Sequence, residues 1–231
     1  MTDRRRSTGR LAVEALAIFA GVTAGFLAED FRESRTEQRQ EREALEQIVR
    51  DLEIDAADIT PIVETSGAIA EAMRWLHNNL RRRDATDDSV VAVLDETPWS
   101  YSYEAANAAY TGLKVAGQLG LIRDIDLRRD IVFYFEDRQA AMEQLNEWAL
   151  GDDLTFWKLL APHVEYAEAD SLFVRPPIEV LDVEGMRSDR LLTTEIMMAG
   201  GSSESQAADG AEILRLNRSL SESIEAYLEN L

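Results

Sequence analysis

The sequence predicts an all-α protein, in which an N-terminal transmembrane helix continues into a stalk and then into an antiparallel helical bundle. Three observations support this prediction. An apolar run of 18 residues, 11–28, follows a short basic N-terminus. A segment that is charged on every helical face comes next. Most of the remaining chain then repeats apolar residues at spacings of three and four, the period of an amphipathic helix.

The composition limits the classes of function. The chain has 231 residues, with 24 Lys and Arg against 44 Asp and Glu, which gives a net charge of −20. So acidic a chain lacks the basic face with which nucleic-acid binders neutralise phosphates, and we expect no nucleic-acid partner. Cysteine is absent, which excludes disulfides, thiolate nucleophiles and cysteine-ligated metals.

Residues 1–10 form a basic N-terminal tail, and residues 11–28 are the predicted transmembrane helix, so we expect a lipid bilayer as one partner. Eighteen helical residues span about 27 Å, slightly less than the hydrocarbon core of a bilayer. A cleaved signal peptide or a buried helix of a soluble protein would fit the same run. Helical pattern on both sides of the candidate cleavage site, Val22-Thr23-Ala24, argues against cleavage.

Small residues follow one face of the predicted membrane helix. At 100° per residue, Glu14, Ala17, Gly21, Gly25 and Ala28 lie near one line, and Gly21 and Gly25 have the GxxxG spacing that lets two helices approach closely. A charge is costly in lipid, so the place of Glu14 on this stripe favours a partner helix. The alternative is a chance GxxxG, with Glu14 reaching the headgroups. The stripe predicts a homo-oligomer or assembly with other membrane-protein subunits.

Residues 29–44 are expected to form a charged juxtamembrane stalk helix, held by pairs such as Arg39–Glu43. A buried face begins at Leu45, where apolar spacing starts, and Thr60-Pro61 is expected to end this helix.

Residues 45–231 form the predicted acidic helical domain, with an irregular segment near 166–185 where Arg175-Pro176-Pro177 forces extended backbone. The sequence IEVLDVEG within that segment fits a short strand or a loop. Gly200 to Ser205 is expected to be a flexible link. The further predicted helices are 61–83, 89–96, 99–116, 126–150, a helix after Asp153, 186–199 and 207–231.

Two parts of the chain resemble a known family. Glu14, then Gly21, then EDFRE at residues 29–33 resemble the N-terminus of an uncharacterised family of small single-pass bacterial membrane proteins, in which Asn and Trp stand where this chain has acidic residues and Phe31. The segment GQLGLIRDIDLRRDIVFYFE, residues 117–136, resembles the central segment of that family. The resemblance covers about a quarter of the chain.

The resemblance implies an N-terminal membrane helix and a helical C-terminal domain, located in the bacterial inner (cytoplasmic) membrane, and it implies no reaction. Arginines flank the apolar run on both sides in similar numbers, so the positive-inside rule gives only a weak preference for one orientation. The uncompensated cluster in residues 1–10 favours an N-terminus in the cytoplasm and an acidic domain outside it.

The family-like central segment predicts a structural corner between two helices. Gly117 closes one helix, Asp124 or Asp126 caps the next, and Arg128 pairs with an acid such as Glu104. A ligand-binding role for Arg128 and Tyr103 is the alternative. The residues of the predicted corner are Tyr103, Glu104, Gly117, Asp124, Leu127, Arg128 and Tyr134.

Catalytic motifs are missing from the sequence: it has no GxSxG, no glycine-rich phosphate loop and no HExxH. His77 and His163 are expected to be packing or helix-end residues, and the many carboxylate pairs are expected by chance among 44 acids. We therefore expect no catalytic residues, no cofactor and no metal site.

Two function classes remain. The first is a membrane-anchored interaction or structural protein, either a self-associating scaffold or an accessory subunit of a larger membrane complex. The second is a membrane-tethered enzyme or ligand-binding domain with a pocket lined by carboxylates and arginine. The stalk, the GxxxG and the missing motifs favour the first.

Overall fold

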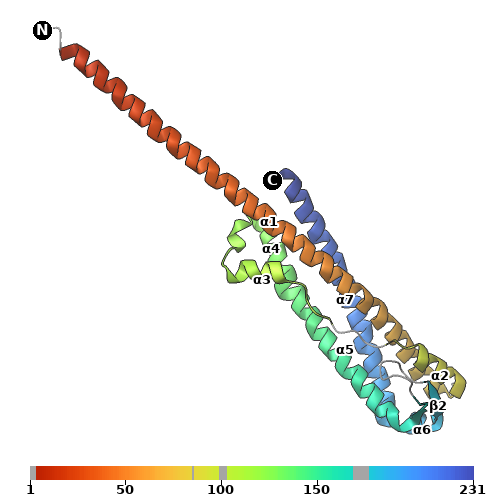
Figure 1. Ribbon diagram of the computed structural model, residues 1–231. Helices are drawn as coiled ribbons and strands as arrows, with labels where there is room; N and C mark the ends of the chain where they lie inside the picture. Colours follow the sequence, from red (N-terminus) through yellow and green to blue (C-terminus); the bar gives the residue numbers. More distant parts are fainter. Residues whose placement is uncertain (1–3, 85, 99–102, 169–176) are drawn as a thin grey trace.

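The structure is a computed structural model. It describes the backbone of residues 4–84, 86–98, 103–168 and 177–231, together with their side chains except for most of 4–28 and residue 180. Helices make up most of the described chain, and the elements form a long bundle from which one helix projects (Figure 1). The predicted all-α class and helical bundle are confirmed.

Helix α1 runs without interruption from Arg4 to Arg82. Its first half projects from the bundle, and its second half is one of the three long rods of the bundle (Figure 1). The predicted break at Thr60-Pro61 is wrong, because Pro61 lies inside this helix on its exposed face. An interior proline costs about 3 kcal/mol. Burial of Ile59 and Ile62 on either side, each worth about 1.5–3 kcal/mol, offsets that cost.

Helix α7, Arg190–Asn230, runs back along α1 in the opposite direction (Figure 1). The predicted flexible link at 200–205 is wrong, because these residues belong to α7. A Cβ on Gly200 would lie only 3.1 Å from Cβ of Met73, so the small residue lets α7 approach α1 closely. A separate short helix, α6, covers Val183–Ser188.

The third rod consists of α4, Ile125–Phe133, a π-helical turn η2, Tyr134–Arg138, and α5, Gln139–Leu160. The predicted interruption near Leu150 and Asp153 is wrong, since α5 continues through both. The Trp157 indole N–H donates to the Asp153 carboxylate at 3.0 Å inside this helix.

Short elements connect the rods. Helix α2 covers Asp87–Glu96, α3 covers Ala108–Val115, and the 3-10 turns η1 and η3 cover Leu119–Leu121 and Ala161–His163. The predicted helix 99–116 is therefore confirmed only over α3. Residues 103–107 are not helical, and 99–102 lie outside the described residues.

The predicted irregular segment contains a two-stranded antiparallel sheet. Strand β1, Val164–Tyr166, pairs with β2, Ile178–Leu181, with Val164 opposite Leu181. The strand alternative for IEVL is thus confirmed, and α6 follows it. Residues 169–176 lie outside the described residues.

Among the described residues, the apolar core divides into two clusters. The first surrounds the corner between α3 and α4, and the second lies near the sheet and α2. Leading members of the first cluster are Leu45, Ile48, Leu52, Ile122, Ile131 and Phe135, and those of the second are Met73, Leu76, Leu94, Phe156, Leu160 and Ile196.

A search of the described residues finds no helix with an apolar stretch long enough to cross a bilayer. The predicted transmembrane helix, 11–28, belongs to α1, but most of its side chains lie outside the described residues.

Candidate functional site

Three layers of buried polar side chains cross the bundle, and each joins α1 to α7. They are centred on Glu41, Asp55 and Ser66 of α1, which lie roughly three to four turns apart on one face of the helix. Their partners on α7 follow in the reverse order along the chain and are Tyr227, Asn217 and Gln206. Buried polar groups are costly unless bonded, so these layers specify how far α1 and α7 slide along each other.

The Asp55 layer is the most extensive. The Asp55 side chain is fully buried, at 0% exposure. Its Oδ1 accepts hydrogen bonds from the Tyr103 hydroxyl at 2.5 Å and from Nε2 of Gln139 at 3.1 Å. The Tyr134 hydroxyl donates to the other oxygen, Oδ2. One carboxylate therefore joins α1 to the segment before α3, to η2 and to α5.

Asn217 extends this layer to α7. Its Nδ2 donates to the Tyr134 hydroxyl at 2.8 Å and to the carbonyl oxygen of Leu52 at 2.9 Å. Tyr134 is the first residue of η2, and π-helical turns frequently mark functional positions in helices. The extra residue of the turn lets Tyr134 reach Asp55 while Gln139, at the start of α5, bonds the same carboxylate.

Burial is the main cause of the raised pKa of Asp55, and the hydrogen bonds from Tyr103, Tyr134 and Gln139 oppose the rise. Within the described chain, no Lys or Arg forms an ion pair with Asp55. Burial, together with the nearby Asp55 charge, raises the pKa values of the Tyr103 and Tyr134 phenols well above their usual range. Both phenols therefore stay protonated and act as donors.

The Glu41 layer holds the stalk against the rest of the bundle, and we call it the Glu41 clasp: Glu41, Arg123, Tyr227, Gln38 and Arg42. Oε1 of the fully buried Glu41 accepts from the backbone N–H of Arg123 at 2.7 Å and from the Tyr227 hydroxyl at 2.8 Å. The Arg123 guanidinium lies 3.5 Å from Oε2. Burial and the bond to Glu41 raise the pKa of Tyr227 to about 12.

The clasp also fastens the end of α7. Nη2 of Arg42 donates to the carbonyl oxygen of Leu228 at 2.9 Å, and Nε2 of Gln38 donates to that of Leu231. The last carbonyls of a helix have no partner within the helix, so these side chains of α1 satisfy them. The bundle therefore begins at Gln38 and Glu41, inside the segment 29–44 that the sequence predicted to be a charged juxtamembrane stalk.

The Ser66 layer lies between the two apolar core clusters. The Ser66 hydroxyl donates to Oε1 of Gln206 at 2.6 Å, and Nε2 of Gln206 donates to Oδ1 of Asn146 at 3.1 Å. This layer thus joins all three rods of the bundle.

The predicted corner exists and has the predicted caps. Gly117 has φ +67, a left-handed conformation that favours glycine, and Asp124 caps α4 by accepting from the Leu127 backbone N–H at 2.9 Å. Leu127 and Tyr134, two residues of the predicted corner, are buried. Glu104 is exposed.

The predicted ion pair between Arg128 and Glu104 is not what the structure shows. Nη1 of Arg128 instead donates to the carbonyl oxygen of Ile122 at 3.4 Å. Tyr103 is buried against Asp55, so Tyr103 and Arg128 have different surroundings. The ligand-binding alternative for this pair gains no support.

The predicted membrane-helix association residues all belong to α1. The side chains of Glu14, Ala17, Gly21 and Ala28 lie outside the described residues. Gly25 is described and exposed, and a Cβ built there would meet nothing within 4 Å. At the Gly25 position itself, α1 therefore makes no close contact with any other described part of the chain.

Asp55 and Asn217, which hold the Asp55 layer on α1 and α7, were not predicted from the sequence. A signal for both was present, because each polar residue stands on its helix between buried apolar residues that lie three or four positions away on either side. Asp55 stands between Leu52 and Ile59, and Asn217 between Ile213 and Leu220. Glu41 and Arg123 gave no such signal.

The two histidines lie apart, in different parts of the fold. Nε2 of His163 lies 3.2 Å from Oδ2 of Asp189, and Oδ1 of Asp189 accepts from the backbone N–H groups of Leu191 and Leu192 at the start of α7. Those bonds, and the bond to His163, lower the pKa of Asp189. His77 lies on α1, where its Nδ1 is buried and has no hydrogen-bond partner among the described residues. Over the described ranges, no three His, Asp or Glu side chains cluster to hold a metal.

Comparisons with protein-family models, with curated proteins and with solved structures find no match. The resemblance carried by residues 29–33 and 117–136 therefore stays a prediction. The structure does bring these regions near each other, since Nη2 of Arg123 contacts the Ser34 carbonyl oxygen and the Glu37 carboxylate, both at 3.4 Å.

Proposed function

We propose that this chain is a membrane-anchored interaction protein that self-associates through its N-terminal helix and presents the bundle as a scaffold. The observation that carries the proposal is the continuity of α1, from the predicted transmembrane helix to the far end of the bundle. A helix projecting from its domain has no tertiary packing to stabilise it, and isolated helices are marginal in water. A bilayer and a partner helix would supply the missing packing.

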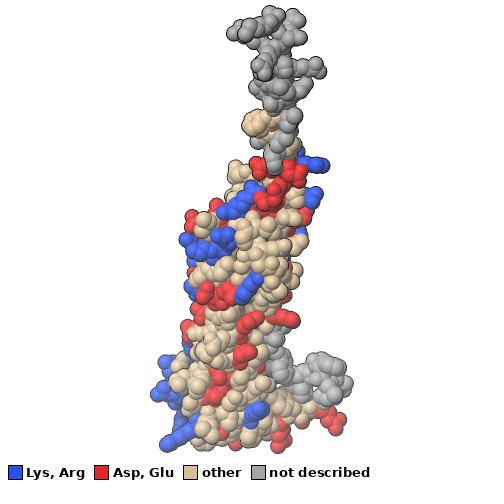
Figure 2. All heavy atoms as spheres, turned by 90° about the vertical axis from the view of Figure 1, so that its left-hand side faces the viewer, with Lys and Arg blue, Asp and Glu red and all other residues tan. Residues whose placement is uncertain are grey.

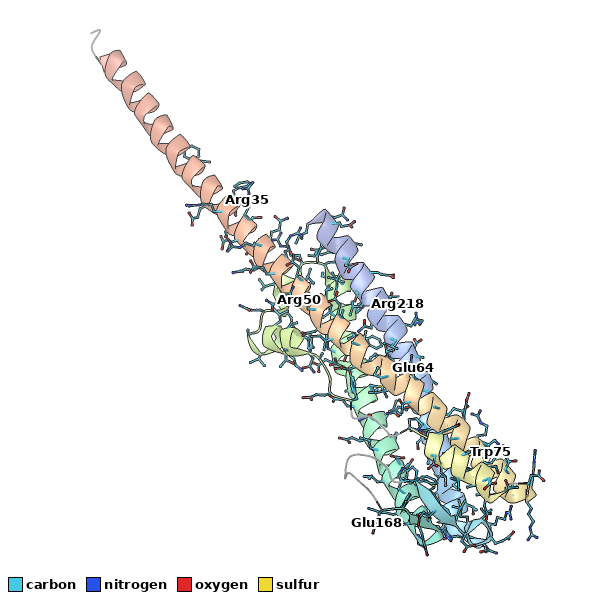
Figure 3. All side chains as sticks on the ribbon, turned by 45° about the vertical axis from the view of Figure 1, so that its right-hand side comes forward. Arg35, Arg50, Glu64, Trp75, Glu168 and Arg218 are labelled. Atoms are coloured by element: carbon cyan, nitrogen blue, oxygen red, sulfur yellow. The ribbon has the colours of Figure 1, made fainter. Side chains whose placement is uncertain are left out.

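Local contacts support a rigid stalk between bilayer and bundle. The Arg35 guanidinium lies 4.4 Å from the centre of the Phe31 ring, and Arg39 pairs with Glu43 at 3.6 Å, as the sequence predicted. Figure 3 shows Arg35 on the projecting part of α1, with Arg50 and Glu64 further along the same helix beside the bundle. A continuous helix would transmit any displacement of the membrane segment to the Glu41 clasp.

The exposed position of Gly25, where a Cβ would meet no described residue within 4 Å, supports association along the predicted stripe of Glu14, Ala17, Gly21, Gly25 and Ala28. A second copy of the chain is the proposed partner, and subunits of a larger membrane complex are the alternative partners. The proposed location is the bacterial inner membrane, with the N-terminus in the cytoplasm and the bundle outside it.

The polar side chains of the bundle also favour an interaction role over catalysis. In the Asp55 and Ser66 layers they bond one another across the core, which stabilises the fold. Figure 2 shows acidic and basic side chains interspersed over one face of the bundle. A mixed, charged surface of this kind keeps a scaffold soluble beside a membrane.

Alkaline carbonate extraction of membranes from cells that express the full chain tests the anchor. The proposal predicts that the full chain stays with the membranes and that a chain consisting of residues 29–231 is released. Release of the full chain by carbonate would contradict the proposal.

A further inference from the structure

Large apolar side chains are exposed on the side of the bundle where α5 and α7 run next to each other (Figure 1). The Ser202 hydroxyl of α7 donates to the Asp152 carboxylate of α5 across this seam. Residues four positions apart on a helix lie on the same face, so Trp148 and Met198 flank that bond, one on each helix. Trp148 is 58% exposed and Met198 is 51% exposed. Two large apolar side chains from different rods therefore meet solvent on one side of the bundle.

The exposed surface continues along both helices. Leu191, which is 71% exposed, lies two turns before Met198 on the same face of α7, and the exposed Ser205 lies two turns after it. On α5, the exposed Thr155 lies two turns after Trp148. We call Trp148, Thr155, Leu191, Met198 and Ser205 the α5–α7 face. All five are uncharged, in a chain in which 29% of the residues are charged. A helix that is apolar on its outer side as well as toward the core indicates a further partner.

The charged groups next to the α5–α7 face have other surroundings. Asp152 accepts from Ser202 beneath the face, and Glu195 is buried, at 9% exposure. Glu204 is directed to the other side of α7, where it pairs with Arg74 of α1 at 3.0 Å. These acids therefore leave the face itself neutral.

The neutral face favours a second copy of this chain as the partner. The chain has a net charge of −20, so two copies repel each other wherever acidic surfaces meet. In a twofold contact the same surface of each copy meets itself, and an uncharged surface avoids that repulsion. A basic partner would instead be attracted to carboxylates, and none of the five residues of the face carries one.

The direction of the rods fits the same partner. Association of two α1 helices in one bilayer would set the two bundles parallel, with a twofold axis along the rods. The α5–α7 face follows the rods, so two copies of it can meet about such an axis. Gly151 and Gly201 lie three residues from Trp148 and Met198, and a Cβ built on either would meet no described atom within 4 Å. These small residues leave room for the Trp148 ring of the other copy.

We propose that the α5–α7 face binds the same face of a second copy of this chain. The inference rests on the proposed self-association through α1 and adds a second contact to it, in the bundle. Membrane helices that hold two copies together raise the effective concentration of the faces, so a contact that is weak alone forms within the pair. Trp148 is the central anchor of the contact, since buried tryptophans dominate interfaces of this kind.

Cysteine cross-linking of the full chain in its own membranes tests the inference, because the natural chain has no cysteine. Met198→Cys and Ser205→Cys should each form a disulfide-linked dimer with a mild oxidant. Ile54→Cys is the matched control, since Ile54 is also exposed, at 54%, but lies on α1 outside the face. It should stay a single chain. Equal cross-linking at all three positions would reflect random collision and would overturn the inference.

Trp148→Lys, introduced into the Ser205→Cys chain, tests the proposed anchor. It places two like charges opposite each other, so the rate of cross-linking should fall about tenfold or more. Leu154→Lys is the control, because Leu154 is 59% exposed on the same helix but points to a different side. It should leave the rate unchanged. Both side chains are more than half exposed, so neither lysine should disturb the fold. An unchanged rate in Trp148→Lys would overturn the inference.

Gly25→Cys distinguishes this inference from the proposed function on which it rests. Cross-linking at Gly25 without cross-linking at Met198 and Ser205 would overturn the contact between bundles and leave the association of the membrane helices standing. If Gly25, Met198 and Ser205 all fail to cross-link, both proposals are overturned.

Discussion

At the level of single residues, Asp55 is a carboxyl group in the core with only neutral hydrogen-bond donors around it: two phenols and an amide. Each donor is in turn held by packing or by a second bond, as with Tyr134, which also accepts from Asn217. The layer is therefore well ordered, yet its charge is uncompensated. This combination makes the stability of the bundle depend on the protonation of one residue.

Asp55→Asn tests that dependence. Burial raises the pKa of Asp55 in the folded chain, so folding favours the protonated form. The contribution of Asp55 to stability is therefore complete below its unfolded-state pKa of 3.8 and is lost as pH rises through its folded pKa. Urea unfolding of the unaltered chain and of Asp55→Asn, both full length and in micelles, measures the effect. The difference between their free energies of unfolding should change with pH over this window. A constant difference from pH 4 to pH 8 would show that Asp55 does not titrate as argued.

Two glycines at the corner provide a second test at this scale. Gly117 has positive φ, so Gly117→Ala should lower the free energy of unfolding by about 1–2 kcal/mol through backbone strain alone, since a Cβ meets nothing within 4 Å. Gly112, inside α3, also has open space around its Cβ. Gly112→Ala should raise stability by about 0.5–1 kcal/mol. The urea midpoint should therefore fall in Gly117→Ala and rise in Gly112→Ala.

At the level of elements, the sequence predicted helical faces better than helical ends. The apolar spacing of Leu45, Ile48 and Leu52 correctly indicated the buried face of α1. Breaks expected at Pro61 and at 200–205 did not occur, because tertiary packing on both sides of each site outweighs the local preference. The caps at Gly117 and Asp124 were predictable because both depend on local geometry.

The candidate site was less predictable than the fold. Tyr103 and Tyr134 were singled out for a corner, but their common partner, Asp55, lies 48 and 79 residues away in the sequence. The Glu41 clasp likewise joins Glu41 to Arg123 and Tyr227, which no local pattern relates. Contacts between distant segments of this kind depend on how the rods pack, and one sequence does not specify that.

Pro61→Ala tests the continuity of α1. If the helix is continuous, alanine restores the missing backbone hydrogen bond, and the free energy of unfolding should rise by about 2–3 kcal/mol. A helix that truly ended at Thr60 would keep proline in its favoured place at the first turn of the next helix. In that case the substitution would leave the urea midpoint unchanged or lower it.

The Glu41 clasp is tested by hydrogen exchange. Glu41→Ala leaves the Arg123 N–H and the Tyr227 hydroxyl without their acceptor, at a cost of about 1–3 kcal/mol. Amide exchange should accelerate near residues 38–45 and 224–231, while the amides around Phe156 and Leu160 keep their protection. Glu43→Ala is the control, since Glu43 is exposed and bonds only along the stalk. Equal exchange in both variants would show that the clasp does not hold these ends together.

At the level of the whole molecule, α1 runs through three parts: a predicted membrane helix, a stalk and a three-rod bundle. The polar layers fix the position of α7 along α1, and the clasp fixes the end of α7 to the stalk. A partner bound along the projecting half of α1 would therefore be coupled mechanically to the bundle.

The native mass of the full chain, extracted gently from its own membranes, tests the central claim of self-association most directly. Gly25→Ile and Thr23→Ile form a matched pair, because both positions are exposed and Thr23 faces away from Gly25 on the helix. The account predicts an oligomer for the unaltered chain and for Thr23→Ile, and a lower mass for Gly25→Ile. A monomer for the unaltered chain, or the same oligomer for all three proteins, would contradict it.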